Sequence, residues 1–325
     1  QRHPMTGADT ADRSGRQIRV GLDVGGTKID AVAVDPSGHI RGRLRRPTGW
    51  GDDAVVESIV MAVTALADES GFPLADVGSV GIGIPGLVDA EAGRVDHAVN
   101  LGVESLDLAE KAERALGVPF RVENDVKAAA LGAAVLSGIA GSMAYLNLGT
   151  GVAAGIVIDG RIWRGARGTA GEVGHLSVDP HGRLCGCGQH GCVETFCGGG
   201  ALAKAWGRPG ALPIRDIFDA ADAGDPLALS LRDDLYHGAA AAVRVLVLSA
   251  DVETVVIGGG LTALGDRLEN GIRAALHAGA EASPFMRSLR LDERIELLPA
   301  GSPAAAFGAA LVGASITEKE IVPHG

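Results

Sequence analysis

The sequence predicts an α/β protein built from two similar lobes with a ligand cleft between them. Residues 18–44 and 143–164 share one order of features, namely strand, glycine–threonine turn, strand, turn and strand. The two stretches lie about 125 residues apart, and such self-similarity indicates a duplicated structural unit. The composition agrees, because 46% hydrophobic and 3% aromatic residues with 49 glycines are typical of an α/β protein packed through small side chains.

Length, charge and cysteine content limit the classes of partner. The 325 residues suffice for two domains with large cores, and the net charge of −11 disfavours nucleic acid and anionic membranes as partners. No apolar run approaches the roughly 18 to 20 residues that span a bilayer. The four cysteines give no disulfide framework, so we expect a cytoplasmic protein. Residues 1–17 are polar and aperiodic, and we interpret them as a tag remnant with a disordered leader.

The first lobe is expected over residues 18–125 and opens with strands at 18–24, 29–35 and 39–44. Its first turn can bind phosphate, because glycine amides approach oxyanions closely while a hydroxyl and an ammonium group add donors. A carboxylate just before this turn can hold hydrated magnesium. A plain hairpin turn is the alternative, but its repetition in the second lobe favours a nucleotide between the lobes. The residues concerned are Asp23, Gly25, Gly26, Thr27 and Lys28.

Apolar residues at helical spacing predict a helix over 52–70, which a strand at 79–84 follows. The next glycines formally match the dinucleotide-binding fingerprint GxGxxG, but that motif must open a helix, whereas 85–96 reads as a turn and hairpin. A helix at 106–116 and a strand at 120–123 then lead to Asn124 and Asp125. Asp125 is either a helix N-cap or a carboxylate at the sheet edge where ligand clefts form, and its position leaves both open.

The second lobe is expected over residues 126–318. It begins with an alanine-rich helix and repeats the opening strands around a turn of Gly149, Thr150 and Gly151. Helices are predicted at 201–206, 214–223 and 226–249, followed by one that ends at about residue 280 and a last one at 303–315. The last helix could pack back on the first lobe. The strand at 254–257 ends in Gly258, Gly259 and Gly260, which form either a simple tight turn or backbone that lies against an adenine or ribose.

Residues 171–194 carry the ligands expected of a structural zinc site. His175, Cys185, Cys187 and Cys192 provide one imidazole and three thiolates, a closed tetrahedral set. Three of the four cysteines fall within eight residues of a segment that also holds the histidine, which argues against a loop that is cysteine-rich by chance. Glu172 and Glu194 flank this set without being needed as ligands, so both are free for another task.

Together these motifs resemble the ROK family of bacterial sugar kinases, whose two lobes are of the actin-like ATPase (ribonuclease H-like) type. The similarity covers residues 18–315. The resemblance implies transfer of the γ-phosphoryl group of ATP, bound with Mg²⁺, to a hexose hydroxyl, usually the 6-hydroxyl. It rests on LDVGGTKI at 22–29, GIGIPGLVD at 81–89, VENDVKAAALG at 122–132, LGTGVAAG at 148–155, the 171–194 loop and VVIGGGL at 255–261.

The resemblance also implies roles for individual residues. Asp125 would be the general base that accepts the hydroxyl proton, while positioning and neutralisation by magnesium contribute most to the rate. His175 would contact the sugar through one ring nitrogen while the other faces zinc. The lobes are expected to close on the sugar, as in other two-lobed enzymes. The sugar-binding residues implied are Asn100, Asn124, Asp125, Glu172, His175 and Glu194.

Glucose is the expected acceptor, and fructose, mannose and N-acetylmannosamine kinases are the alternatives within the family. Polyphosphate stays open as the donor. Some relatives are sugar-responsive repressors, but the acidic charge, the intact catalytic residues and the short segment before the first strand disfavour that class. A homodimer or homotetramer is expected from the resemblance alone. The sugar's identity is in doubt because the chain departs from the usual pattern at Gly102, Val103, Lys127, Ala153 and Ala154.

Overall fold

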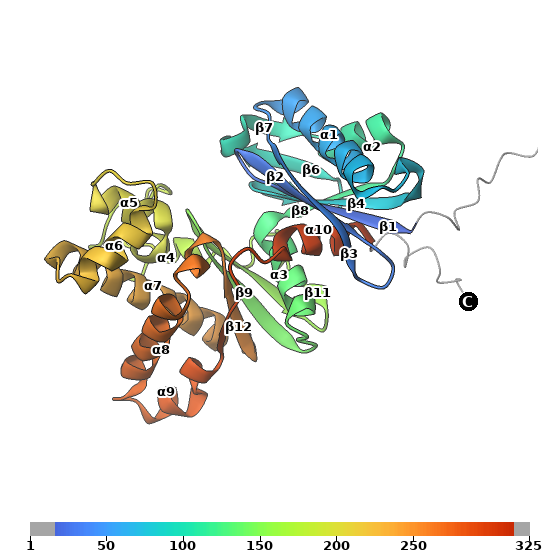
Figure 1. Cartoon of the computed structure of the whole chain (residues 1–325). Coiled ribbons are helices and arrows are strands. Elements are labelled where there is room, and N and C mark those ends of the chain that lie inside the picture. Colours follow the sequence, from blue (N-terminus) through green and yellow to red (C-terminus); the bar gives the residue numbers. More distant parts are fainter. Residues whose placement is uncertain (1–16, 315–325) are drawn as a thin grey trace, which may run out of the picture.

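The computed structural model describes residues 17–314, and the predicted leader lies outside this range except for Gln17 (Figure 1). A five-stranded sheet forms the centre of the first lobe, in the order β3-β2-β1-β4-β8. β1 pairs antiparallel with β2 and parallel with β4, so the carboxyl ends of β1, β4 and β8 share one edge. The strands are β1 (Ile18–Val24), β2 (Lys28–Val34), β3 (Ile40–Pro47), β4 (Val77–Ile84) and β8 (Phe120–Asn124).

The second lobe repeats this sheet. Its order is β11-β10-β9-β12-β13, with β9 antiparallel to β10 and parallel to β12. Each strand therefore has a counterpart in the first sheet, which confirms the duplication expected from the two glycine–threonine turns. The strands are β9 (Ser142–Leu148), β10 (Val152–Ile158), β11 (Arg161–Ile162), β12 (Thr254–Gly258) and β13 (Ile295–Leu297).

Two helices and a small sheet complete the first lobe. α1 (Asp52–Ser70) buries the apolar face that its spacing predicts, and it ends at Gly71 in the left-handed conformation. α2 (Leu108–Leu116) begins two residues later than expected, because the residues before it pair with β6 as a strand. β4 is followed by a hairpin, so the GxGxxG match does not open a helix as a dinucleotide-binding fingerprint must. The small sheet comprises β5 (Leu87–Asp89), β6 (Arg94–Ala98) and β7 (Val103–Leu106).

The remaining helices gather around the second sheet, on the side away from the first lobe in Figure 1. The longest of them, α7, starts at a proline, and the Asp225 side chain caps it by accepting hydrogen bonds from two backbone amides. α9 was not predicted, since only six residues follow its Ser283 cap. The helices are α4 (Val193–Cys197), α5 (Gly199–Trp206), α6 (Pro213–Asp222), α7 (Pro226–Ala250), α8 (Asp266–Ala280) and α9 (Pro284–Leu289).

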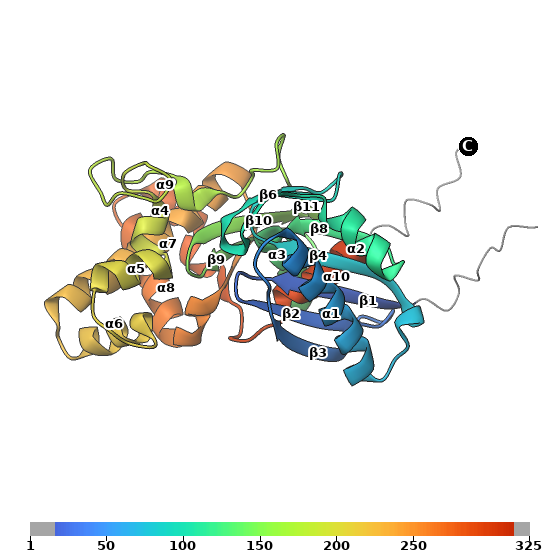
Figure 2. The same cartoon turned by 90° about the horizontal axis from the view of Figure 1, so that it is seen from above.

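Two helices rich in small residues lie between the sheets (Figure 1 and Figure 2). α10 (Ala304–Ala314) packs on β1 and β4, while α3 (Asp125–Leu136) packs on β9 and β10 and against α10. Their backbones touch, because a Cβ on Gly308 would lie 1.7 Å from the Ala128 carbonyl oxygen. This close packing fixes the start of α3, which carries Asp125, relative to both sheets.

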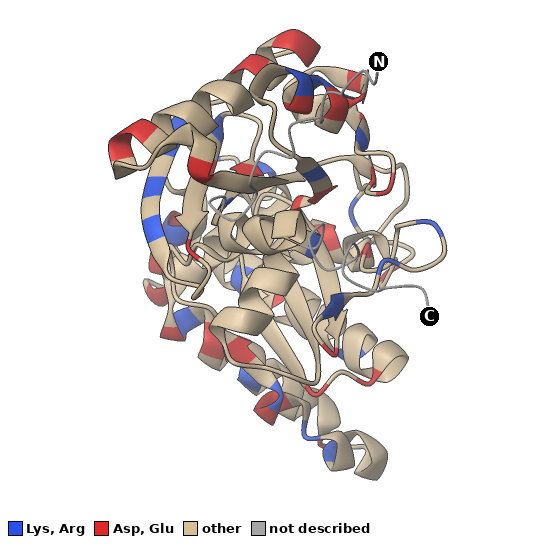
Figure 3. Cartoon of the chain, turned by 90° about the vertical axis from the view of Figure 1, so that its right-hand side faces the viewer, with Lys and Arg blue, Asp and Glu red and all other residues tan. Residues whose placement is uncertain are grey.

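Charged side chains are distributed unevenly over the molecule. Figure 3 shows acidic and basic residues interspersed over the outer elements, whereas the elements between the lobes are mainly uncharged. Within residues 17–314 no helix combines the length and apolarity that crossing a bilayer requires.

Candidate functional site

Residues from both lobes line one cavity of about 270 Å³. Asp23 near the end of β1 and Asp125 at the start of α3 come from the carboxyl edge of the first sheet, where α/β proteins bind ligands. The second lobe contributes the glycine turn after β12. Three features that were predicted separately, namely Asp23, Asp125 and this turn, therefore line the same cavity. Also lining it are Gly258, Gly259, Gly260, Tyr145, Asn147, Thr262 and Ser302.

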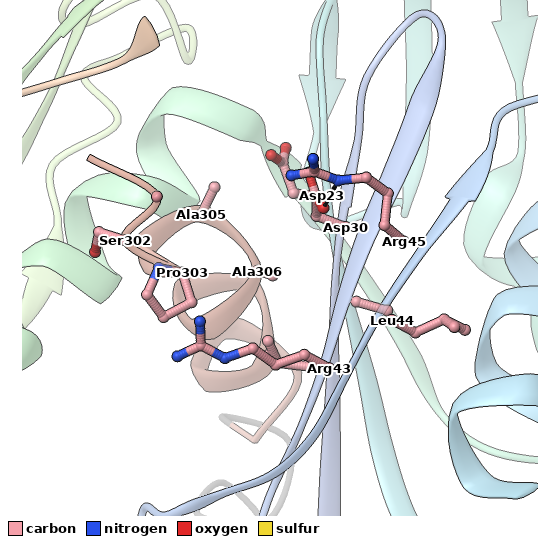
Figure 4. A pocket seen from close by; sticks show the side chains of 12 residues that line it. Asp23, Asp30, Arg43, Leu44, Arg45, Ser302, Pro303, Ala305 and Ala306 are labelled. Atoms are coloured by element: carbon pink, nitrogen blue, oxygen red, sulfur yellow. Dashed lines mark hydrogen bonds and ion pairs between the residues drawn. The ribbon is translucent and has the colours of Figure 1, made fainter. Parts of the chain in front are cut away.

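Asp23 lies in a strongly acidic part of this cavity. Burial, together with the neighbouring charges of Asp125 and Asp30, raises its pKa to about 7. A groove of about 370 Å³ continues from Asp23 along β2 and β3 (Figure 4), and there Arg45 pairs with Asp30 at 2.5 Å. Asp30 therefore has a cationic partner, whereas Asp23 and Asp125 form no ion pair among the described residues and face one cavity. Two carboxylates with so little compensation suit a divalent cation that carries phosphate oxygens.

Asp23→Asn should stabilise the ligand-free protein at neutral pH. The folded chain holds this proton up to about pH 7, whereas an unfolded chain releases it near pH 3.8. The folded state binds more protons in this window, so wild-type stability falls as the pH rises from 4 to 7. We expect a gain of roughly 1 to 3 kcal/mol at pH 8, since one pKa unit is worth about 1.4 kcal/mol and solvent screens part of it.

Urea unfolding at pH 4 and pH 8 without magnesium tests this prediction. The two proteins should differ most at pH 8 and much less at pH 4, because pH 4 is close to the unfolded pKa of 3.8 and little proton uptake on folding remains there. A variant that is no more stable than wild type at pH 8 would contradict the raised pKa of Asp23.

Asp125 is not the N-cap of α3. Asn124 is the N-cap of α3, and its Oδ1 accepts hydrogen bonds from the amides of Val126 and Lys127 at 3.1 and 3.2 Å. Asp125 is therefore the first helical residue, and one of its oxygens accepts a bond from the Val126 amide at 2.9 Å. Burial raises its pKa, with a smaller contribution from the charge of Glu172. Its second oxygen remains available to a ligand.

A second, smaller cavity of about 50 Å³ is lined in part by Asn124, the residue before Asp125. Asn124, Lys127 and Glu172 line it, so it joins two residues predicted to bind sugar. Next to them Glu123, only 2% exposed, accepts a hydrogen bond of 2.7 Å from Arg164 Nε. This ion pair ties the last part of β8 to the segment after β11, and hence one sheet to the other.

Other predicted residues lie outside both linings. Asn100 sits against the first glycine turn, where a Cβ on Gly26 would lie 2.9 Å from its carbonyl oxygen. Glu194 sits against the second turn, where its carboxylate accepts a bond of 2.9 Å from the Val152 amide. The two turns follow β1 and β9 at equivalent places. Outside the linings of both cavities are Gly25, Gly26, Thr27, Lys28, Gly149, Thr150 and Gly151.

Sequence reasoning missed Tyr145, Asn147, Thr262 and Ser302 as lining residues. Asn147 could have been found, because a lone amide side chain in an otherwise apolar strand just before a glycine turn is unusual. Tyr145 gives no such signal, since an aromatic residue in a strand reads as core.

The four predicted metal ligands converge in space. Ligand atoms of His175, Cys185, Cys187 and Cys192 all lie within 4.8 Å of one another. Cys187 Sγ lies 3.6 Å from Cys192 Sγ, and His175 Nδ1 lies 3.8 Å from Cys185 Sγ. A tetrahedral zinc ion with Zn–S bonds of about 2.3 Å separates its sulfur ligands by about 3.7 Å, so the set fits this metal.

The thiols also have the chemistry of a cation site. Donors on Gln189 lower the pKa of Cys187 to about 6, whereas burial raises the pKa of Cys192 to about 12. With its pKa raised in this way, Cys192 becomes a thiolate at neutral pH only beside a cation. Tight turns hold the loop in shape: a Cβ on Gly191 would lie 1.7 Å from the Asp179 carbonyl oxygen. Arg183 anchors the loop by an ion pair to Asp234 on α7.

Comparison with known proteins decides the family. The ROK family profile matches residues 19–313 of the chain. The chain belongs to the ROK family. It is 33% identical over 282 residues to a glucokinase of Halalkalibacterium halodurans, across 80% of this chain and 86% of that relative.

Solved structures agree on the fold of this ROK protein. The ROK hexokinase of Thermus thermophilus superposes with a TM-score of 0.76 at 33% identity, covering 93% of this chain and 99% of the other. A ROK family glucokinase of Streptomyces griseus, solved with glucose and AMPPNP, gives 0.75 at 30% identity, covering 92% and 99%. The predicted family and the two-lobed actin-like ATPase fold are confirmed.

Proposed function

We propose that this ROK protein is an ATP-dependent hexose kinase with glucose as its preferred acceptor. The observation that carries the proposal is the 270 Å³ cavity, in which Asp23 and Asp125 of one lobe face the Gly258–Gly260 turn of the other. Such a cavity can hold a nucleotide's phosphates beside a carboxylate base. The similarity to a glucokinase and to a glucokinase structure holding glucose and AMPPNP supports both the acceptor and the donor.

In the proposed reaction, Asp125 accepts the proton of the sugar hydroxyl through its free oxygen. That hydroxyl oxygen then bonds to the γ-phosphorus of ATP while the bond to the bridging β–γ oxygen breaks, which releases ADP. Asp23 would hold Mg²⁺, which when bound neutralises charge on the phosphate oxygens. The Gly258–Gly260 backbone would lie against the nucleoside, and the two glycine–threonine turns would approach the phosphates when the lobes close.

The sugar would occupy the side of Asp125 that holds Asn124 and Glu172. Asn100, His175 and Glu194 would complete its hydrogen bonds. His175 Nδ1 faces the thiol group of Cys185, which leaves Nε2 for a sugar hydroxyl. A structural zinc ion held by His175 and the three cysteines would therefore also orient a sugar ligand.

A sugar-dependent ADP release assay tests the proposed function. Purified protein with magnesium and ATP should release ADP with glucose at a kcat/KM at least about tenfold above mannose, fructose, N-acetylglucosamine and N-acetylmannosamine, since one misplaced polar group costs at least that factor. Faster turnover of another hexose would overturn the choice of glucose. No sugar-dependent ADP release with any of them would overturn the kinase proposal.

A further inference from the structure

Lys127 is a buried charge that the proposed reaction does not yet use. Lys127 is only 3% exposed, and it lies two positions after Asp125 in the first turn of α3. It lines the 50 Å³ cavity together with Asn124 and Glu172. Among the described residues, no hydrogen-bond or ion-pair partner of its ammonium group is found within 4.0 Å. Its Nζ is not one of the fully buried polar atoms without a partner among the described residues, so the ammonium group reaches the open space of this cavity.

The other charges around this cavity do not compensate Lys127. Glu123 is already paired with Arg164 at 2.6 Å, and its other oxygen accepts a bond from the Asn124 amide at 2.9 Å. Arg167 adds a further positive charge to the lining. Within residues 17–314, Glu172 has no ion pair at 4.0 Å or less. The cavity thus offers one uncommitted ammonium donor and one uncommitted carboxylate acceptor.

A hydroxyl group fits between such a donor and acceptor, because it can accept one hydrogen bond while it donates another. The cavity of about 50 Å³ has room for one or two groups of that size. A hydrogen bond donated by an ammonium group is also stronger than one between neutral groups. A sugar presents hydroxyls in this form, whereas an apolar substituent would leave both charges unpaired.

We propose that Lys127 is a specificity-determining residue of the acceptor site, whose ammonium group donates a hydrogen bond to a sugar hydroxyl that Glu172 helps to hold. This inference rests on the proposed hexose kinase function. It adds Lys127 to the residues that were predicted to bind the sugar. A second effect follows from its position, because the positive charge of Lys127 lowers the pKa of Asp125 and favours the ionised base.

The test compares Lys127→Met, which keeps the side-chain length without the charge, with the matched control Lys111→Met. Lys111 lies on α2 and pairs with the exposed Asp53 at 3.5 Å, away from both cavities. Lys127→Met should raise the KM for glucose about tenfold to a hundredfold with an unchanged KM for ATP, because a charged hydrogen bond contributes that factor. The control should retain both KM values.

Deoxyglucoses that each lack one hydroxyl separate a direct contact from a structural role. The deoxyglucose that lacks the hydroxyl contacted by Lys127 should bind wild type as weakly as glucose binds Lys127→Met. The variant should bind this deoxyglucose and glucose with equal affinity. Lys127→Gln, which keeps a donor, should restore part of the affinity and replaces the methionine variant if that one does not fold. Calorimetric glucose binding reads out the same loss without turnover.

Two outcomes overturn the inference. One is a wild-type KM for glucose in Lys127→Met, and the other is an equal further loss with every deoxyglucose. If wild type phosphorylates no hexose, the proposed function fails together with this inference. If wild type phosphorylates glucose and Lys127→Met is unaffected, only the role of Lys127 fails.

Discussion

Asp125→Asn is expected to lower kcat with ATP and glucose by about a thousandfold or more, at the upper end of what a general base contributes. An amide cannot accept the hydroxyl proton, so the nucleophile stays protonated when it meets the phosphorus. The fold should persist. Asn124 caps α3, and an asparagine at position 125 keeps an oxygen that can accept from the Val126 amide while it removes a carboxylate whose pKa burial has raised. The KM for ATP should change little, since Asp23 and the Gly258–Gly260 turn remain.

The measurement is steady-state kinetics combined with thermal unfolding of the same preparations. Asp266→Asn is a matched control, because Asp266 is also the first residue of a helix, α8, after a glycine turn of the second lobe. The control should keep its wild-type rate and both variants should unfold near the wild-type temperature. Wild-type turnover in Asp125→Asn would show that another group takes the proton.

Cys187→Ser is expected to lose the metal and, with it, the shape of the 171–194 loop. Wild type should bind one zinc ion per chain, and the variant less than about a tenth of that, since a closed structural site needs all four ligands. Metal binding and local folding are coupled, so the melting temperature should fall by about 5 °C or more. The KM for glucose should rise at least about tenfold because His175 loses its orientation.

Metal analysis by mass spectrometry, thermal unfolding and glucose kinetics check this prediction together. Cys197→Ala is the matched control, because Cys197 is fully buried on α4 and belongs to no metal-ligating group within the part of the chain described. It should keep its zinc while losing some packing energy. A Cys187→Ser protein that is zinc-replete and as stable as wild type would contradict the ligand assignment.

Much of the fold could be predicted because its signals are local and repeated. The glycine–threonine turns at Thr27 and Thr150 follow equivalent strands, and the two sheets have the same order. The four residues proposed to bind zinc lie within one short segment, so their spacing alone predicted that they meet. Short elements were missed, among them β7 and the six-residue helix α9, because a segment this short shows no recognisable hydrophobic periodicity.

The long-range part of the site could not be predicted from the residues alone. Asp23 and Asp125 share a cavity only because β1 and β8 end at the same sheet edge. The pairing of Glu123 with Arg164 depends on how the two sheets meet, which no local pattern encodes. The burial of Lys127 is a tertiary effect as well, because a lysine in a first helical turn normally reaches solvent.

Phosphorus NMR of a complete reaction tests the central claim most directly. With wild-type protein, MgATP and glucose, one sugar phosphate ester should form for each ADP, and inorganic phosphate should stay at its background level. The ester should be glucose 6-phosphate, because the proposed function takes the 6-hydroxyl as the acceptor, as the family resemblance implies. Inorganic phosphate in place of the ester, or unchanged ATP, would contradict phosphoryl transfer to the sugar.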